Sequence, residues 1–496
     1  MKNQFIFSIL FIGSNILSAE VEITATQKNK KAIVKQKIQC NMTIKYKKRP
    51  RKVNSIKEVF TKGIFYGRIR SNNFIYNTNG TEYDHFITGI GGSLIYKSAK
   101  YKNFSFTTGL YTSATLNNIS KNKLSTYKAG KDTFSRYVMA KNNRNNISLF
   151  AQNYISYKKS RTELKVGRFL LETLLLKSND SKMIPNAFEG ANLQIRSIPK
   201  TQIQLAYIKK QKLRDHEKFH NVLAYGDNQD DLYSQWSLND DGAMHRGITS
   251  SKLNEKGIND RIFLFEGKNQ SLKNTTVKIG YTVVPKLISS LIVESTYKFK
   301  LDAGLIIKPS IHYMKQFDNG AGQIAGANLR TDVRGYDKPN SLSNTLLANR
   351  IDFIYGASSL RLGHSKVYEG GDIISPWRAQ PTSGYTRAMS QTNWYANTKT
   401  IMLRADFDFE KANLINGLHI MSRYAIQNFD DNKPGVSSDL NIFTFDIIKR
   451  FKEYPNFMMK LRTGFIREDH KITNIDGTIK KDPSYNDIRI EMNYLF

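Results

Sequence analysis

The sequence is poor in cysteine, in long apolar runs and in acidic residues. One cysteine among 496 residues excludes a disulfide framework and a cysteine-based zinc site. Beyond the N-terminal region, no stretch reaches the roughly 18 consecutive apolar residues that a membrane-spanning helix needs. Since backbone N–H and C=O groups must all be paired in hydrocarbon, such a chain can cross a membrane only as a closed β-barrel. Asp and Glu number 42 against 75 Lys and Arg, a net charge of +33 that should attract anions.

The N-terminus has the features of a secretory signal peptide. A basic residue precedes an apolar run from Phe5 to Leu17, and Ser18-Ala19 provides the cleavage site. We therefore expect residues 1–19 to be a signal peptide. Residues 20–62 are rich in lysine and lack sustained apolar periodicity, which predicts a basic, flexible N-terminal segment.

Residues 63–496 consist mainly of segments of about ten residues in which apolar and polar side chains alternate. The last ten residues, DIRIEMNYLF, are the clearest case, with an apolar face opposite a charged one. This pattern is typical of a transmembrane β-barrel, apolar toward lipid and polar toward a wet lumen. Short turns alternate with long polar stretches, as expected for periplasmic turns and external loops. The eighteen predicted strands are 64–76, 84–97, 101–112, 146–157, 161–168, 190–197, 200–209, 257–267, 273–283, 289–301, 304–317, 346–355, 358–367, 398–409, 416–428, 438–451, 456–467 and 485–496.

The predicted fold class is therefore all-β: a transmembrane antiparallel barrel of about 18 strands over residues 63–496. A secreted sandwich, β-helix or adhesin is the alternative for a β-rich chain of this size. The sequence has no fixed-period repeat, which disfavours solenoids and propellers. Apolar residues occupy the outward positions of strand after strand, for example Ile401, Leu403 and Phe407, and this favours the barrel.

Basic residues recur on the polar face of the predicted strands. An arginine on the lipid face near the midplane would cost about 2–4 kcal/mol, so we expect these side chains to point into the lumen. A row of guanidinium groups can pass a carboxylate from one to the next through bidentate contacts. Pairing with lumenal Asp or Glu, which would only brace the wall, is the alternative for each of them. The predicted pore-lining residues are Arg68, Arg70, Arg350, Arg404, Arg423, Lys460, Arg462 and Arg489.

Eighteen strands enclose a lumen too wide to discriminate small solutes, so selectivity requires a segment folded inward. Residues 167–190 are the candidate, because they join two predicted strands and combine apolar residues with a charged cluster. We expect Leu174–Leu176 to pack on the wall, and Asp180 and Lys182 to project into the channel. By composition alone, a surface loop is the alternative for this segment.

Residues 167–190 resemble the constriction-loop motif of the OprD family of outer-membrane porins. In that motif a Gly-Arg pair, a hydrophobic stretch, a Ser-Asp-Asp-like cluster and Leu-Pro-x-x-Phe-Glu-Gly follow in order. Asn179 stands where the family usually has an acid, and Lys182 where it often has arginine, which leaves the selectivity open. Further similarity lies at 60–70, 363–367, 376–387, 397–408 and 485–496. The residues that match the motif are Gly167, Arg168, Leu174–Leu176, Ser178, Asn179, Asp180, Pro185, Phe188, Glu189 and Gly190.

The resemblance implies an eighteen-stranded barrel in the outer membrane of a Gram-negative bacterium, with an inward loop and a basic ladder. It also implies passive diffusion of amino acids, peptides or small organic acids without ATP or a cofactor. Expected partners are small carboxylate-bearing solutes, outer-membrane lipid and, during insertion, the barrel-assembly machinery. A homotrimer is left open, and no nucleic acid is expected.

Two other functions are compatible with a barrel. A non-conducting adhesin or structural barrel would have the same strand pattern. A barrel hydrolase would need a catalytic site, but none of the eight His residues lies in a Gly-x-Ser-x-Gly or His-Glu-x-x-His context. We therefore predict no enzyme activity, no catalytic residue and no metal site.

Overall fold

The computed structural model describes ten segments of the chain. The predicted signal peptide, residues 1–19, lies outside them. In the described part, no helix is both long and apolar enough to cross a bilayer. The described segments are residues 36–39, 42–46, 50–78, 84–124, 127, 133–228, 244–376, 379–389, 392–474 and 476–496.

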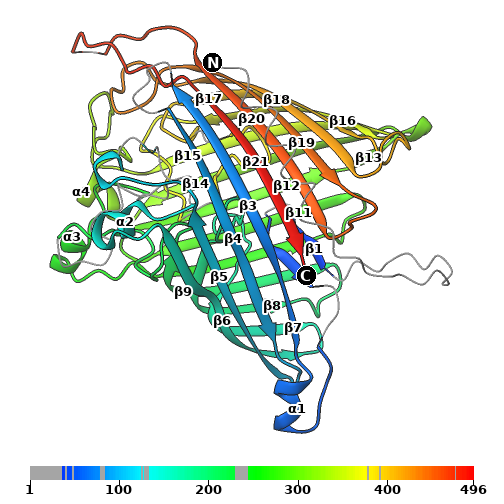
Figure 1. Ribbon diagram of the computed structural model, residues 1–496. Coiled ribbons are helices and arrows are strands. Elements are labelled where there is room, and N and C mark those ends of the chain that lie inside the picture. The colour runs from blue at the N-terminus through cyan, green and yellow to red at the C-terminus, as the bar shows by residue number, and fades with distance from the viewer. Residues whose placement is uncertain are drawn as a thin grey trace. The chain divides into compact units, whose positions relative to one another are not determined.

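Eighteen long antiparallel strands follow one another around a closed barrel (Figure 1). The last strand pairs with the first along its whole length, so the sheet has no free edge. A two-residue strand, β13 (Phe299–Lys300), extends one hairpin. The predicted barrel is confirmed. Its strands are β3 (Ile64–Thr78), β4 (His85–Lys97), β5 (Phe104–Thr115), β6 (Asn146–Lys159), β7 (Thr162–Phe169), β8 (Ala187–Ile195), β9 (Thr201–Lys212), β10 (Ile262–Asn269), β11 (Thr275–Val284), β12 (Ile288–Tyr297), β14 (Ile306–Asp318), β15 (Asn344–Tyr355), β16 (Ser358–Val367), β17 (Lys399–Asp408), β18 (Leu418–Asn428), β19 (Leu440–Arg450), β20 (Phe457–Glu468) and β21 (Tyr485–Leu495).

Several strand boundaries differ from the prediction by a few residues. β5 begins at Phe104, not at residue 101, because Lys102 and Asn103 both have positive φ angles and form the turn. β8 begins at Ala187, not at residue 190, so the last residues of the predicted inward segment belong to a strand. Turn chemistry therefore decides strand ends that alternation leaves undefined.

The two faces of the wall differ as predicted. On β3, Phe65 and Ile69 are 66% and 61% exposed, whereas their neighbours Tyr66, Arg68 and Arg70 are buried on the inward face. Exposing these apolar side chains to water would cost free energy, whereas exposing them to lipid costs little.

The outward face gives the first testable prediction. Leu403 is 42% exposed and lies in the middle of β17. Replacing it with arginine should destabilise the vesicle-inserted barrel by about 2–4 kcal/mol, because the guanidinium would face hydrocarbon. Urea unfolding from vesicles measures this loss, and Leu403→Met is the matched control. Equal unfolding midpoints for the two variants would mean that Leu403 does not face lipid.

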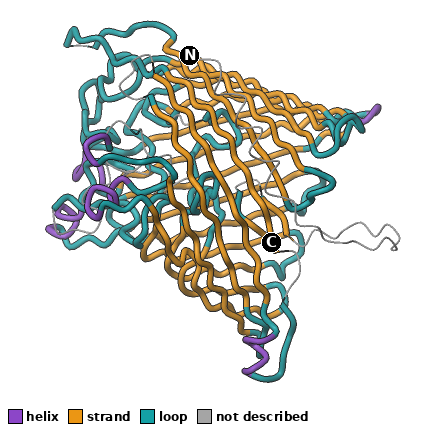
Figure 2. Tube along the Cα trace, viewed as in Figure 1, coloured by secondary structure: helices purple, strands orange, loops and turns teal. Residues whose placement is uncertain are grey.

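The two ends of the barrel differ in their connections. The segments 116–145, 213–261, 319–343 and 368–398 leave the same end, and the turns at the other end are short. Three short helices, α2 (Arg136–Asn142), α3 (Ser250–Glu255) and α4 (Ala321–Ala325), belong to the long loops. Figure 2 shows these helices at one end of the wall and α1 (Ile56–Thr61) at the other. In outer-membrane barrels the short turns are on the periplasmic side. Because α1 lies at the end with the short turns, we assign it to that side.

Part of the segment predicted to be flexible, residues 20–62, forms regular structure. β1 (Gln36–Ile38) and β2 (Ile44–Tyr46) pair as an antiparallel hairpin, and α1 follows. Ile44 and Tyr46 attach this hairpin to the barrel by packing against a buried apolar cluster that includes Tyr66 and Ile95. The lysine-rich composition of the segment gave no indication of this contact. The flexible interpretation therefore does not hold for these elements.

Candidate pore and constriction site

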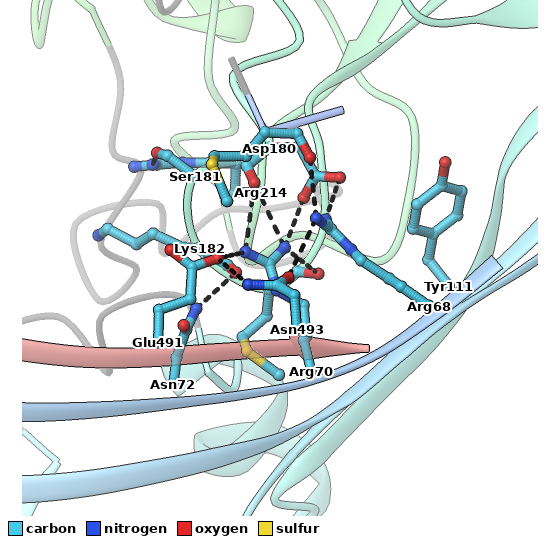
Figure 3. Close-up of polar contacts among 12 residues, drawn as sticks. Arg68, Arg70, Asn72, Tyr111, Asp180, Ser181, Lys182, Arg214, Glu491 and Asn493 are labelled. Carbon is cyan, nitrogen blue, oxygen red and sulfur yellow. Dashed lines mark hydrogen bonds and ion pairs between the residues drawn. The ribbon is translucent and has the colours of Figure 1, made fainter. Parts of the chain in front are cut away.

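The loop between β7 and β8, residues 170–186, folds across the inside of the barrel. Leu175 and Leu176 are buried in the largest apolar cluster of the described residues, which also contains Phe169 and Phe188. Leu174 packs against this cluster. Asp180, near the middle of the loop, contacts β3 and lies close to β21 (Figure 3). β3 lies four strands away from β7 around the wall, so the loop crosses the lumen to make this contact.

Asp180 binds two arginines of β3 at once. Its Oδ2 accepts a hydrogen bond from Arg68, and its Oδ1 accepts one from Nη1 of Arg70 at 2.8 Å. Nη2 of Arg70 also donates to Oε1 of Glu491 on β21 at 2.6 Å. The loop backbone is held as well, since Nδ2 of Asn72 donates to the carbonyl of Lys182 at 2.6 Å. These charge-assisted contacts fix the loop to the wall.

This geometry corrects three sequence predictions. The sequence predicts that Arg68 and Arg70 line the pore and that Asp180 projects into it. All three residues are about 1% exposed, and Asp180 forms ion pairs with both arginines. A charged group is tolerated in a buried position only when it is paired, and here Asp180 neutralises both guanidinium groups. The bracing alternative applies to these arginines.

Arg168, Phe188 and Glu189 also differ from the prediction, because they lie on β7 and β8 and not in the loop. Nε of Arg168 donates to Oε2 of Glu189 at 2.9 Å across these paired strands, and its guanidinium lies over the ring of Phe219. Phe188 is buried. The pair therefore holds the base of the loop.

The remaining predicted residues lie within the loop. The hydroxyl of Ser178 accepts a hydrogen bond from the backbone N–H of Leu171 at 2.9 Å, which closes the loop on itself. Pro185 is buried. Asn179 and Lys182 border a cavity, and Asn179 has a left-handed φ of 38° that turns the chain there.

A cavity of ≈ 1090 Å³ lies beside the loop and is strongly basic. Thirteen of its described lining residues are Lys or Arg, and only Asp482 and Glu491 are acidic. Arg350 borders a second cavity of ≈ 720 Å³, which shares lining residues with the first. The first cavity includes five of the predicted pore-lining residues, Arg404, Arg423, Lys460, Arg462 and Arg489.

Most of these arginines have a carboxylate partner behind them. Arg404 pairs with Asp406, Arg462 with Asp446 and Arg489 with Asp487, each with a closest N···O distance of 2.6 Å. The carboxylates are more buried than the guanidinium groups, so the basic group is the one nearer the cavity. Lys460 lies 3.6 Å from Asp446 and shares that carboxylate.

Arg423 differs from its neighbours. Its Nη2 lies 3.1 Å from the sulfur of Met421, and no ion pair joins Arg423 to a carboxylate of the described residues. It stands directly opposite Arg404, which in turn stands opposite Arg361 on the next strand. Like charges directly opposite each other repel and destabilise a sheet. An anion bound at this row of arginines would reduce the repulsion.

Seven basic residues that line the cavity escaped the sequence analysis, and Arg361 and Arg387 show two different reasons for this. Arg361 alternates with Leu360 and Leu362 on β16, so the same strand pattern could have found it. Arg387 lies in the loop after β16, donates to the carbonyl of Ala388 and gives no strand signal. Nothing in the local sequence marks Arg387 as a lining residue.

The long loops are tied together beside the basic cavity. Asp372 accepts hydrogen bonds from the backbone N–H groups of Leu329 at 2.9 Å and Ala396 at 2.8 Å, and from the hydroxyl of Tyr336 at 2.7 Å. Burial raises the pKa of Asp372 to about 6, and these donors oppose that shift. Asp372 thus joins loop 319–343 to loop 368–398. Within the described segments, no group of acidic, His and Cys side chains is arranged to hold a metal ion.

Residues 123–433 match a family model described as "outer membrane porin, OprD family". Solved structures share the fold at low identity. OpdK of Pseudomonas aeruginosa, solved with vanillate, is 13% identical, with a TM-score of 0.65 over 87% of this chain and 98% of that one. A BenF-like porin from Pseudomonas fluorescens is 14% identical, with a TM-score of 0.65 over 88% and 99%. OccK2 (OpdF) of Pseudomonas aeruginosa, in complex with glucuronate, is 14% identical, with a TM-score of 0.61 over 87% and 98%. No curated protein matches the sequence.

Proposed function

The chain belongs to the OprD family of outer-membrane porins, and on that basis we propose that it conducts small carboxylate-bearing solutes in preference to neutral or cationic ones. As a member of this family, it is a channel of the Gram-negative outer membrane that serves small-molecule uptake. We propose that passage is passive diffusion through the lumen, without a catalytic step.

The observation that carries the proposal is the row of Arg361, Arg404 and Arg423 along the basic cavity. Arg361 and Arg404 each contact a carboxylate of the wall, and Arg423 does not contact one among the described residues. A solute carboxylate at Arg423 would supply the missing anion through a bidentate, charge-assisted contact. Arg404 and Arg361, the next two members of the row, would add attraction along it without holding the solute tightly.

Two relatives support the same solute class. The OpdK structure was solved with vanillate and the OccK2 structure with glucuronate, and both ligands are carboxylates. This chain shares only 13–14% of its residues with those proteins, so the support concerns the class of solute and not its identity.

A matched pair of solutes tests the proposal. Vesicles containing the purified protein are loaded with a labelled carboxylic acid or with its neutral amide of the same size, and efflux is followed at low solute concentration. A hydrogen bond to a charged group is worth about 1.5–3 kcal/mol, so we expect the acid to leave about tenfold faster. Empty vesicles give the control for leakage through lipid. Equal rates, or a faster amide, would contradict the proposal.

A further inference from the structure

The β1–β2 hairpin lies against the inward face of the barrel wall. The carbonyl of Met42 accepts a hydrogen bond from Nη1 of Arg68 at 2.8 Å. The ring of Tyr46 stacks on the ring of Tyr66, with centroids 5.2 Å apart. Arg68 and Tyr66 both belong to the lumenal face of β3, whose outward neighbour Phe65 is exposed. The hairpin is therefore inside the lumen, near the periplasmic end of β3.

The hairpin and the constriction loop are packed as one unit. Ile44 and Tyr46 contact the apolar cluster that contains Met183 and Ile184 of the loop. Arg68 joins the two elements directly, because one of its amino groups binds Met42 and the other binds Asp180. The segment before the barrel thus reinforces the element expected to narrow the pore.

The residues on either side of the hairpin turn border the two cavities. Gln39 borders the smaller cavity and Met42 borders the basic one. Both cavities are also bordered by Gly384 and Tyr385 of the loop after β16. We therefore expect a solute that moves from one cavity to the other to pass between that loop and the side chains of Gln39 and Met42.

The described residues on either side of the hairpin turn are held by hydrogen bonds. The N–H of Met42 donates to the carbonyl of Gln39 at 2.9 Å, and Nε2 of Gln39 donates to the hydroxyl of Thr43 at 2.7 Å. Met42 has a φ of 66°, which a side-chain-bearing residue rarely adopts, and the hydrogen bond from Arg68 to its carbonyl holds it there. The Met42 side chain is therefore presented to the cavity from a fixed backbone.

We propose that the N-terminal hairpin is a second constriction element, which enters the lumen from the periplasmic end and sets, through Gln39 and Met42, the width of the passage between the two cavities. This proposal rests on the channel function proposed above. It assigns a role in size selection to a segment outside the barrel strands and outside the loop at residues 170–186.

Thiol labelling in planar bilayers tests the proposal. Gln39→Cys is made together with Cys40→Ser, which removes the only native cysteine. A negatively charged, membrane-impermeant methanethiosulfonate reagent should then reduce the single-channel current by about half or more, because the adduct fills a narrow passage. The matched control is Lys57→Cys in the same background, on the exposed helix α1, where the reagent should leave the current unchanged.

A second variant tests the same passage by removing atoms. Met42→Gly suits the positive φ of this position and deletes the side chain that borders the basic cavity, so we expect a larger conductance. If Met42→Gly does not insert into the bilayer, the proposal is judged from the labelling of the Gln39→Cys variant, which retains Met42. Unchanged currents in the labelled protein, with normal wild-type conductance, would overturn the hairpin proposal. Absence of current from the wild-type protein would instead overturn the channel function.

Discussion

Replacing Asp180 with alanine is expected to release the constriction loop and to increase the channel conductance several-fold. The substitution leaves Arg68 and Arg70 with buried guanidinium groups that have lost their shared carboxylate. Removing one partner of a buried ion pair typically costs about 3–5 kcal/mol. Since Arg70 keeps Glu491, the loss should fall mainly on the attachment of the loop and not on the barrel. Single-channel recording measures the conductance, and limited proteolysis of the loop measures its release.

The control for this prediction is Asp302→Ala, which removes an exposed carboxylate in the connection between β13 and β14. Asp180→Asn adds a graded variant, because the amide keeps an acceptor for one arginine but carries no charge. We expect its conductance to lie between those of the wild type and Asp180→Ala. Unchanged conductance in Asp180→Ala, with the loop still resistant to protease, would show that Asp180 does not hold the loop.

Arg423→Gln is expected to reduce the anion preference of the channel, because it removes a lumenal positive charge that no ion pair to a described carboxylate neutralises. Arg404, Arg462 and Arg489 are each partly neutralised by a wall carboxylate, so removing one of them also removes a counter-charge from an acid. Arg423 has no such partner among the described residues, and its removal subtracts a positive charge from the cavity without exposing an acid behind it. The reversal potential in a salt gradient should therefore shift toward zero.

Arg467→Gln is the matched control, because Arg467 lies on the exposed side near the end of β20. It removes the same charge from the protein but not from the lumen. If the two variants had the same reversal potential as the wild type, Arg423 would have no role in selecting anions. A shift in both would indicate an effect of net charge alone.

The sequence was sufficient for the barrel because strand alternation is a local property. Phe65, Arg68 and Ile69 show their inward or outward direction within a few residues of chain, and lipid on one side makes the pattern consistent. The same logic gave the direction of Arg404 and Arg462, which border the basic cavity. Strand ends were less certain, since they depend on turn residues such as Asn103.

The candidate site was less predictable because it is built from contacts between distant parts of the chain. Asp180 and Arg68 are 112 residues apart, and no local pattern indicates that they meet. The sequence pattern predicts that both side chains point into the lumen, but it does not show that they pair there and are closed to solutes. The hairpin was missed for a related reason: Tyr46 finds an apolar partner only inside the closed barrel, whereas in the sequence it stands among lysines.

The measurement that tests the central claim most directly is the reversal potential of the wild-type channel in a potassium chloride gradient across a planar bilayer. A lumen whose accessible groups are mainly arginine and lysine should pass chloride in preference to potassium, and the sign of the potential should report anion selectivity. A potential of the opposite sign would mean that the wall carboxylates, and not the guanidinium groups, govern permeation.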